Sequence, residues 1–203
     1  TIVNNKTINI DSTNGIGIYV DNSDENIGTS EERIRESNKI TSIGTINLNG
    51  NNNIGVVVKE LDLTFEKDKG LTTDGIIFGN SNGIGVYAEN SNITINEKIS
   101  KTFGTNQINN ILIASIGKEN SETKVIENNG TISLNGSNNI GIYLGNNTKY
   151  SSDIDENKNI RGSIEVSDGA IGIYADEGAS VLENINITSD SKGNQTIGVV
   201  LQG

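Results

Sequence analysis

The chain has 203 residues, with 26 Asp and Glu against 15 Lys and Arg, a formal net charge of −11, and no Pro, Cys, Met, Trp or His. The charge argues against nucleic acid and anionic membrane surfaces as partners, because both are bound mainly through cationic side chains. Without Cys or His the chain has no disulfide, no thiolate zinc site and no imidazole base. No stretch is long and apolar enough to predict direct insertion into a membrane.

A short phrase, NGIGIYV at 14–20, returns along the chain as NGIGVYA at 82–88 and in looser forms elsewhere. Seven copies of this main phrase lie at 16–20, 54–58, 84–88, 111–115, 140–144, 171–175 and 197–201. A second phrase, such as TINI at 7–10 or TISL at 131–134, precedes most copies by about eight residues. Both phrases are rich in Ile and Val, which favours β-strands.

A weaker third strand is predicted between the main phrase and the next second phrase, as at 92–96, 124–128 and 180–184. Three strands recurring about every 30 residues indicate a stacked solenoid, because a propeller blade needs four strands of similar length. The sequence therefore predicts an all-β fold, a parallel β-helix (β-solenoid) of about seven coils. Residues 1–203 form one such segment, and the start at Thr1 suggests an excerpt of a longer protein.

Alternation along a strand predicts which side chains face the interior. In the first copy, Ile16, Ile18 and Val20 are expected to point inward, and Gly17 and Tyr19 outward. The central position should form one buried ladder of Ile18, Val56, Val86, Ile113, Ile142, Ile173 and Val199. The Gly-x-Gly pattern is a product of this repeat, since a dinucleotide-binding turn also needs a third Gly and a following helix.

Segments of variable length separate the repeated phrases, and the longest are 21–43, 59–74, 116–130 and 145–162. In the first, SEERIRES at 30–37 is compatible with a short helix. In the second, Leu61, Leu63 and Phe65 alternate as in a longer third strand. Insertions at one point of a repeat emerge on one side of a solenoid, where they are either solvated loops or a contact surface.

The acidic residues do not have the pattern of a calcium-binding loop or of a carbohydrate-active site. Asp153, Asp155 and Asn157 have the first spacings of a calcium-binding EF-hand loop, but Lys158 and Ile164 stand where Gly and Glu are needed. An enzyme on a β-helix needs carboxylates gathered on one outer face. The outward positions of the second phrase are predicted to be Asn9, Asn47, Ile77, Gly104, Ser133, Glu165 and Asn186, with a single carboxylate. We therefore expect no enzyme, no catalytic residue, no metal and no cofactor.

The outward position of the main phrase predicts a ladder of Tyr19, Val57, Tyr87, Ala114, Tyr143, Tyr174 and Val200. Three of these tyrosines, Tyr87, Tyr143 and Tyr174, form a candidate binding surface, because Tyr offers a large contact area at little rotamer cost. Outward glycines beside them would keep the surface low. The acidic loop 145–162, with Asp153, Asp155 and Glu156, is expected to lie next to them. The alternative is that the rings only cover the sheet.

The stretch NNGTISLNGSNNIGIYLGNN at 128–147, with its relatives at 44–58 and 161–175, resembles the passenger repeats of type V autotransporter adhesins. The Asn-, Ile- and Lys-rich composition is most similar to the large fusobacterial outer-membrane adhesins. This resemblance implies a right-handed β-helical passenger displayed outside the bacterial cell and anchored through an outer-membrane barrel beyond these residues.

The resemblance also implies a non-catalytic role in attachment. The expected partners are a host cell-surface protein, a host glycan or the surface of a partner bacterium. Two alternatives stay open: a carbohydrate-active β-helix enzyme, and a structural stalk whose binding tip lies elsewhere. The ligand and the oligomeric state do not follow from the residues.

Overall fold

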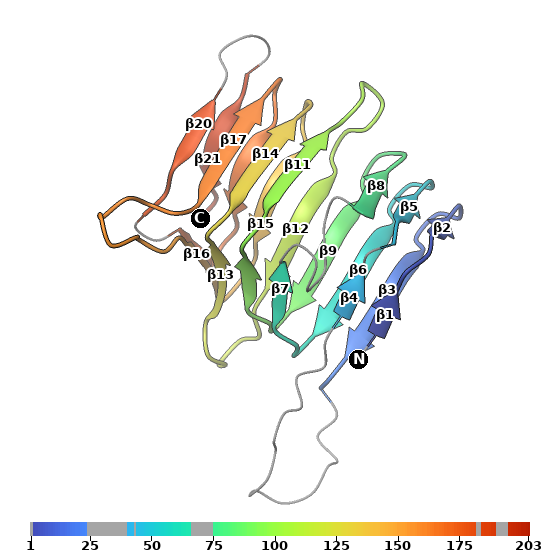
Figure 1. The fold of residues 1–203 in the computed structure, drawn as a ribbon, viewed down its shortest axis with the longest axis horizontal. Helices are drawn as coiled ribbons and strands as arrows, with labels where there is room; N and C mark the ends of the chain where they lie inside the picture. Colours follow the sequence, from blue (N-terminus) through green and yellow to red (C-terminus); the bar gives the residue numbers. More distant parts are fainter. Residues whose placement is uncertain (1, 24–39, 43, 66–74, 182–183, 190–194) are drawn as a thin grey trace, which may run out of the picture.

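A computed structural model describes residues 2–23, 40–42, 44–65, 75–181, 184–189 and 195–203. The named strands in these ranges stack side by side along the long axis of the molecule (Figure 1), and neighbours such as β3 and β6 pair in parallel. The predicted all-β parallel β-solenoid is therefore confirmed.

The main phrase forms one sheet of seven strands, here the main face. Its strands are β3 (Ile16–Asp21), β6 (Ile54–Lys59), β9 (Ile84–Glu89), β12 (Ile111–Ile116), β15 (Ile140–Leu144), β18 (Ile171–Ala175) and β21 (Ile197–Leu201). The second phrase forms the second face, with β2 (Ile8–Ile10), β5 (Ile46–Leu48), β8 (Ile76–Phe78), β11 (Lys98–Thr102), β14 (Thr131–Asn135), β17 (Ser163–Ser167) and β20 (Ile187–Ser189).

The third face consists of β1 (Ile2–Asn4), β4 (Ile40–Ser42), β7 (Leu63–Phe65), β10 (Ile93–Ile95), β13 (Lys124–Asn128), β16 (Thr148–Ser151) and β19 (Ser180–Val181). The last five pair continuously, which corresponds to about five turns. The third strands predicted at 92–96 and 124–128 are confirmed as β10 and β13, and β7 forms part of the longer strand expected from Leu61 to Phe65. Of the third strand predicted at 180–184, the structure describes β19 at Ser180–Val181. The expected count of seven coils and the right-handed sense remain predictions, and the proposed helix at 30–37 lies outside the described residues.

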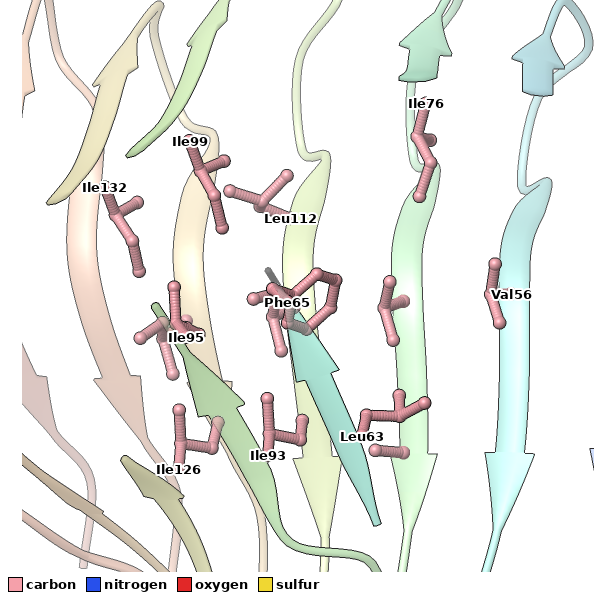
Figure 2. Packing of buried hydrophobic residues seen from close by; sticks show 14 of the residues in the cluster. Val56, Leu63, Phe65, Ile76, Ile93, Ile95, Ile99, Leu112, Ile126 and Ile132 are labelled. Carbon is pink, nitrogen blue, oxygen red and sulfur yellow. The ribbon is translucent and has the colours of Figure 1, made fainter. Parts of the chain in front are cut away.

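The interior is filled by ladders of aliphatic side chains from all three faces (Figure 2). The predicted central ladder is confirmed: Ile18 pairs with Val56 and Ile142 with Ile173, and the register continues to Val199. Its members are buried from Ile18 to Ile173, and Val199 is partly buried. One aromatic residue that the sequence did not mark as core, Tyr150, is also fully buried.

The glycine of the main phrase faces the interior, which corrects the expected alternation. A Cβ at Gly17 would lie 2.7 Å from the Gly55 carbonyl oxygen and 3.0 Å from Cγ2 of the core residue Ile46. Gly17 and Ile18 thus both face inward. The preceding Ile16, expected to be buried, is 48% exposed. Strict alternation fails here because only a residue without a side chain lets successive coils approach so closely.

Asparagine builds the corner between the second and main faces. Asn14, Asn52, Asn82, Asn109 and Asn138 all have positive φ, between 57° and 61°. Asn adopts this left-handed conformation more readily than most residues. The side chains of adjacent coils also bond to each other, as where Asn52 Nδ2 donates to Asn14 Oδ1 at 3.1 Å. The recurring Asn-Gly and Asn-Asn pairs of the sequence therefore encode the corner.

The second face is interrupted between β8 and β11. The eight-residue spacing placed Phe103 and Gly104 in this strand, but Ile99 pairs with Ile132 and Ser100 with Ser133. Phe103 lies beyond the strand and packs edge-on against Phe78, with ring centroids 5.2 Å apart. Side chains replace the missing ladder: Lys101 Nζ donates to the Ile76 carbonyl at 2.7 Å, and Gln107 Nε2 to the Phe78 carbonyl at 2.6 Å.

Two longer insertions in the described chain, 117–123 and 152–162, both border the third face. The first joins β12 of the main face to β13, and the second joins β16 to β17 of the second face. They therefore lie at opposite edges of the third face, the first beside the main face and the second beside the second face.

Candidate binding surface

The predicted outward ladder of the main face is confirmed in its register. Tyr19 pairs with Val57, and Val57 with Tyr87. Ala114 lies between Tyr87 and Tyr143, and Tyr143 pairs with Tyr174. Tyr19 is 51% exposed, and the three candidate tyrosines are half-buried. One line of phenol rings therefore follows the solenoid axis.

Tyr143 and Tyr174 form the most ordered part of this line. Their rings are stacked, with centroids 5.7 Å apart and an interplanar angle of 10°. The Tyr143 hydroxyl donates to Asp176 Oδ2 at 2.7 Å, and the Tyr174 hydroxyl donates to Gln202 Oε1. Both rings are thus held in place by contacts within the chain.

These contacts also raise the pKa of Tyr143. Burial, followed by the hydrogen bond to Asp176, raises the pKa of Tyr143 to about 12. The Tyr143 hydroxyl, together with the Glu177 amide, lowers the pKa of the Asp176 carboxyl. Burial, followed by the charge of Glu89, raises the pKa of Tyr87. Tyr87 and Tyr143 therefore keep neutral phenols at physiological pH.

The glycines do not keep the surface beside the tyrosines low, as was expected. Small residues within the outward ladder do so instead. Gly85, Gly141 and Gly172 are buried and face the interior. The small outward residues are Val57 and Ala114, only 4% and 2% exposed between flanking tyrosines. The rings thus cover part of the sheet, as the alternative interpretation expected, and still present their edges to solvent.

The acidic loop does not lie beside the tyrosines. Residues 145–147 follow β15 directly, β16 continues on the third face, and residues 152–162 form the corner between the third and second faces. Ser152 Oγ donates to the Asn128 carbonyl at 2.6 Å and the Asp153 amide to Asn129 Oδ1 at 3.2 Å, which fixes this corner. The expectation failed because a third-face strand separates Tyr143 from the insertion.

The acidic side chains of this corner serve its own folding. Asp155 Oδ1 accepts the backbone amides of Asn159 and Asn157 at 2.8 and 2.9 Å, which lowers the pKa of the Asp155 carboxyl. Asp153 Oδ1 accepts the Ile154 amide at 2.8 Å, and Glu156 is exposed. Within the described ranges no group of three or more Asp and Glu side chains is arranged to hold a metal ion.

The outward row of the second face starts at other residues than expected in the later coils. Its outward row in the later coils is Ser100, Ser133, Glu165 and Thr188, which replaces the expected Gly104 and Asn186. A shallow pocket of about 360 Å³ lies here, lined by Glu165 and by Ser and Thr hydroxyls. Glu165 is the one carboxylate among these four residues, as the sequence indicated for the strand.

A hollow on the third face, which was not predicted from the sequence, is larger than the pocket on the second face. This third-face groove has a volume of about 460 Å³ and is lined by Asn92, Thr94, Glu122, Thr123, Glu127 and Lys149, over a floor that includes Ile93 and Val125. The alternation in NITIN and KVIEN points to Thr94 and Glu127 as outward residues. The sequence does not show that Thr94 and Glu127 lie beside Glu122 and Thr123, because that depends on how the turn before β13 folds.

Comparisons with known proteins leave the fold as the main guide to function. No protein-family model, curated protein sequence or solved structure matches this chain. A search of the described residues for a helix long and apolar enough to cross a membrane found none.

Proposed function

We propose that this chain is a non-catalytic adhesin segment that attaches through an outer face of its β-solenoid. It is displayed at a bacterial cell surface as part of a type V autotransporter passenger, similar to the large fusobacterial outer-membrane adhesins. Its partner is a host cell-surface protein, a host glycan or the surface of another bacterium. The likeness of its repeats to such passengers supports the family and the location.

One observation carries the adhesive role: the line of tyrosines on the continuous main face. Tyr143 and Tyr174 are stacked, and their hydroxyls are anchored by Asp176 and Gln202. Ordered aromatic side chains are frequent anchors in binding surfaces, because little rotamer freedom is lost when they are covered. A stalk without a partner needs no such ordering on its outer side.

The test is a triple Tyr87→Ser, Tyr143→Ser, Tyr174→Ser variant, assayed for pull-down on host cells and partner bacteria. We expect binding to fall while the β-sheet circular-dichroism signal and cooperative unfolding persist. Ile77→Ser is the matched control, because Ile77 is 50% exposed on the second face, away from the tyrosines. Undiminished binding of a folded triple variant contradicts the role of the tyrosines, and a wild-type chain that binds neither cell type favours the stalk.

The enzyme alternative is tested separately by incubating the chain with acidic and neutral polysaccharides, with and without calcium. We expect no time-dependent cleavage.

A further inference from the structure

The third-face groove gathers polar groups that the fold leaves unused. Thr94 lies between the fully buried Ile93 and Ile95, so its hydroxyl points outward, and Lys149 is placed likewise between Thr148 and Tyr150. Within the described part of the chain, no hydrogen bond or ion pair occupies the Lys149 ammonium, the Glu122 carboxylate or the Thr94 hydroxyl. These groups face one hollow of about 460 Å³.

One wall of the groove is held in place by Asn147. Its Nδ2 donates to the carbonyls of Lys118 and Ser121 at 2.9 and 3.0 Å, and its Oδ1 accepts the Thr123 hydroxyl at 2.9 Å. The Ser121 hydroxyl also reaches Asn90 Oδ1 at 3.1 Å. The turn that carries Glu122 and Thr123 is thus fixed against the neighbouring coils, so a ligand need not order it on binding.

The floor is fixed by the sheet itself. Asn92 Oδ1 accepts the Val125 amide at 3.0 Å, and one oxygen of Glu127 accepts Asn129 Nδ2 at 2.6 Å. Asn92 and Glu127 both line the groove, and these bonds hold their side chains in place. The site therefore offers donors and acceptors in fixed positions on rigid strands, which is what specific hydrogen bonding to a small ligand requires.

The chemistry of the lining selects among ligand classes. Its apolar residues, Ile93 and Val125, supply no aromatic pocket of the kind that anchors a protein partner. Two carboxylates against one ammonium disfavour a phosphate or another anion. A hydroxyl group on a ligand can both donate and accept a hydrogen bond. Such groups match this lining, in which Lys149 donates, Glu122 and Glu127 accept, and Thr94 does both.

We propose that the third-face groove binds a neutral, hydroxyl-rich saccharide unit, with Lys149, Glu127, Glu122 and Thr94 bonding its hydroxyls. Asn147 is a positioning residue that holds the wall. The inference deepens the proposed attachment function and rests on it for the source of the saccharide, a surface glycan. The groove lies on the third face and the tyrosines on the main face, so the two can be tested apart.

The experiment is an amide chemical-shift titration of the purified, isotope-labelled chain with lactose, maltose and cellobiose. We expect saturable shifts at Thr94, Val125 and Lys149 with at least one of these probes. Lys149→Met and Glu127→Gln each remove a charged hydrogen-bonding group and should weaken binding by about tenfold or more. Asn147→Ala should weaken binding although it removes no side chain that lines the groove, because the turn that carries Glu122 and Thr123 loses its support.

Lys98→Met and Glu165→Gln are the matched controls, since both lie on the second face, and they should leave the titration unchanged. Melting curves establish that each variant is folded. The proposal is overturned by the absence of saturable shifts with all three disaccharides, by shifts that survive both groove variants, or by equal shifts with calcium chloride alone. If the shifts persist while the chain binds no cells, the groove stands and the attachment function fails.

Discussion

The main and second faces are built from equally repetitive sequence, but only the main face is an unbroken ladder. Its strands keep one register through all seven members, whereas the second face divides into groups of three and four strands. The difference lies in the spacing after the second phrase. In β14 the residue Ile132 precedes Ile140 by eight positions, but Ile99, its partner in β11, precedes Ile111 by twelve.

The comparison indicates that the main face is the continuous sheet on which the coils of the solenoid are aligned. Four extra residues between β11 and β12 displace a strand of the second face and leave the main face in register. The interruption is repaired by Lys101 and Gln107, whose side chains take the place of backbone donors. Changes on the main face should therefore cost more than changes at the interruption.

The largest effect is expected from Ile142→Ala in the central ladder. Ile142 is fully buried and pairs with Ile113 and Ile173, so the truncation leaves a cavity between coils. We expect a loss of about 2–5 kcal/mol in the free energy of unfolding, measured by urea denaturation. Ile77→Ala, an equal truncation at an exposed site, should change stability by less than about 0.5 kcal/mol. Equal effects of the two changes would rule out this register.

The inward glycine allows a paired test on the same sheet. A Cβ at Gly55 would lie 2.6 Å from the Gly85 carbonyl oxygen, whereas at Gly198 the nearest atom would be Ile187 Cγ2 at 3.4 Å. Gly55→Ala forces neighbouring coils apart and should destabilise the chain by about 1–3 kcal/mol. In Gly198→Ala the added Cβ makes only an ordinary van der Waals contact, so the free energy of unfolding should not change. A neutral Gly55→Ala would show that the coils are less closely packed there.

Much of this architecture could be predicted because the repeat fixes the register. The spacing of the main phrase placed Ile18 over Val56 and Tyr143 beside Tyr174, as the structure confirms. The inward glycine was missed because strict alternation cannot represent two successive inward positions. The start of β11 was missed because Ile99 and Phe103 are both apolar, and only Phe103 has the usual spacing to Ile111.

The candidate sites were less predictable for a topological reason. The tyrosines share one position of the repeat, so their ladder follows from the sequence. Asp153 and Asp155 stand close to Tyr143 in the chain, but β16 intervenes and carries them to another corner. The third-face groove depends on how the turn before β13 folds onto Asn147, a long-range contact that no local pattern encodes.

A smaller effect is expected from Lys101→Met at the interruption. The change removes the ammonium that donates to the Ile76 carbonyl but keeps most of the aliphatic side chain. We expect a loss of about 1 kcal/mol, the usual net contribution of one hydrogen bond. The control is Lys98→Met in the same strand, because Lys98 is exposed. Faster amide exchange in β8 for Lys101→Met alone would locate the effect, and identical behaviour of both variants would contradict this role of Lys101.

The smallest effect concerns the pH dependence that Tyr143 on the main face gives to stability. The pKa of Tyr143 is raised from 10.0 to about 12, so the folded chain holds this proton more tightly than the unfolded chain. The resulting stabilisation is complete below pH 10 and is lost as the pH rises toward 12. Because the ring is partly exposed, solvent screening should keep this contribution below about 1 kcal/mol.

Tyr143→Phe removes the titrating hydroxyl and its hydrogen bond to Asp176 but keeps the stacked ring. The urea midpoint of the wild type should therefore fall more steeply than that of the variant between pH 10 and 12. A tyrosinate absorbance titration of both proteins assigns the late-titrating phenol. Tyr19→Phe is the control, because Tyr19 lies in the same ladder and its hydroxyl also donates to a carboxylate, Asp21, but the ring is 51% exposed. Equal slopes for wild type and Tyr143→Phe would mean that the Tyr143 hydroxyl is solvated and that only ring stacking orders this end of the main face.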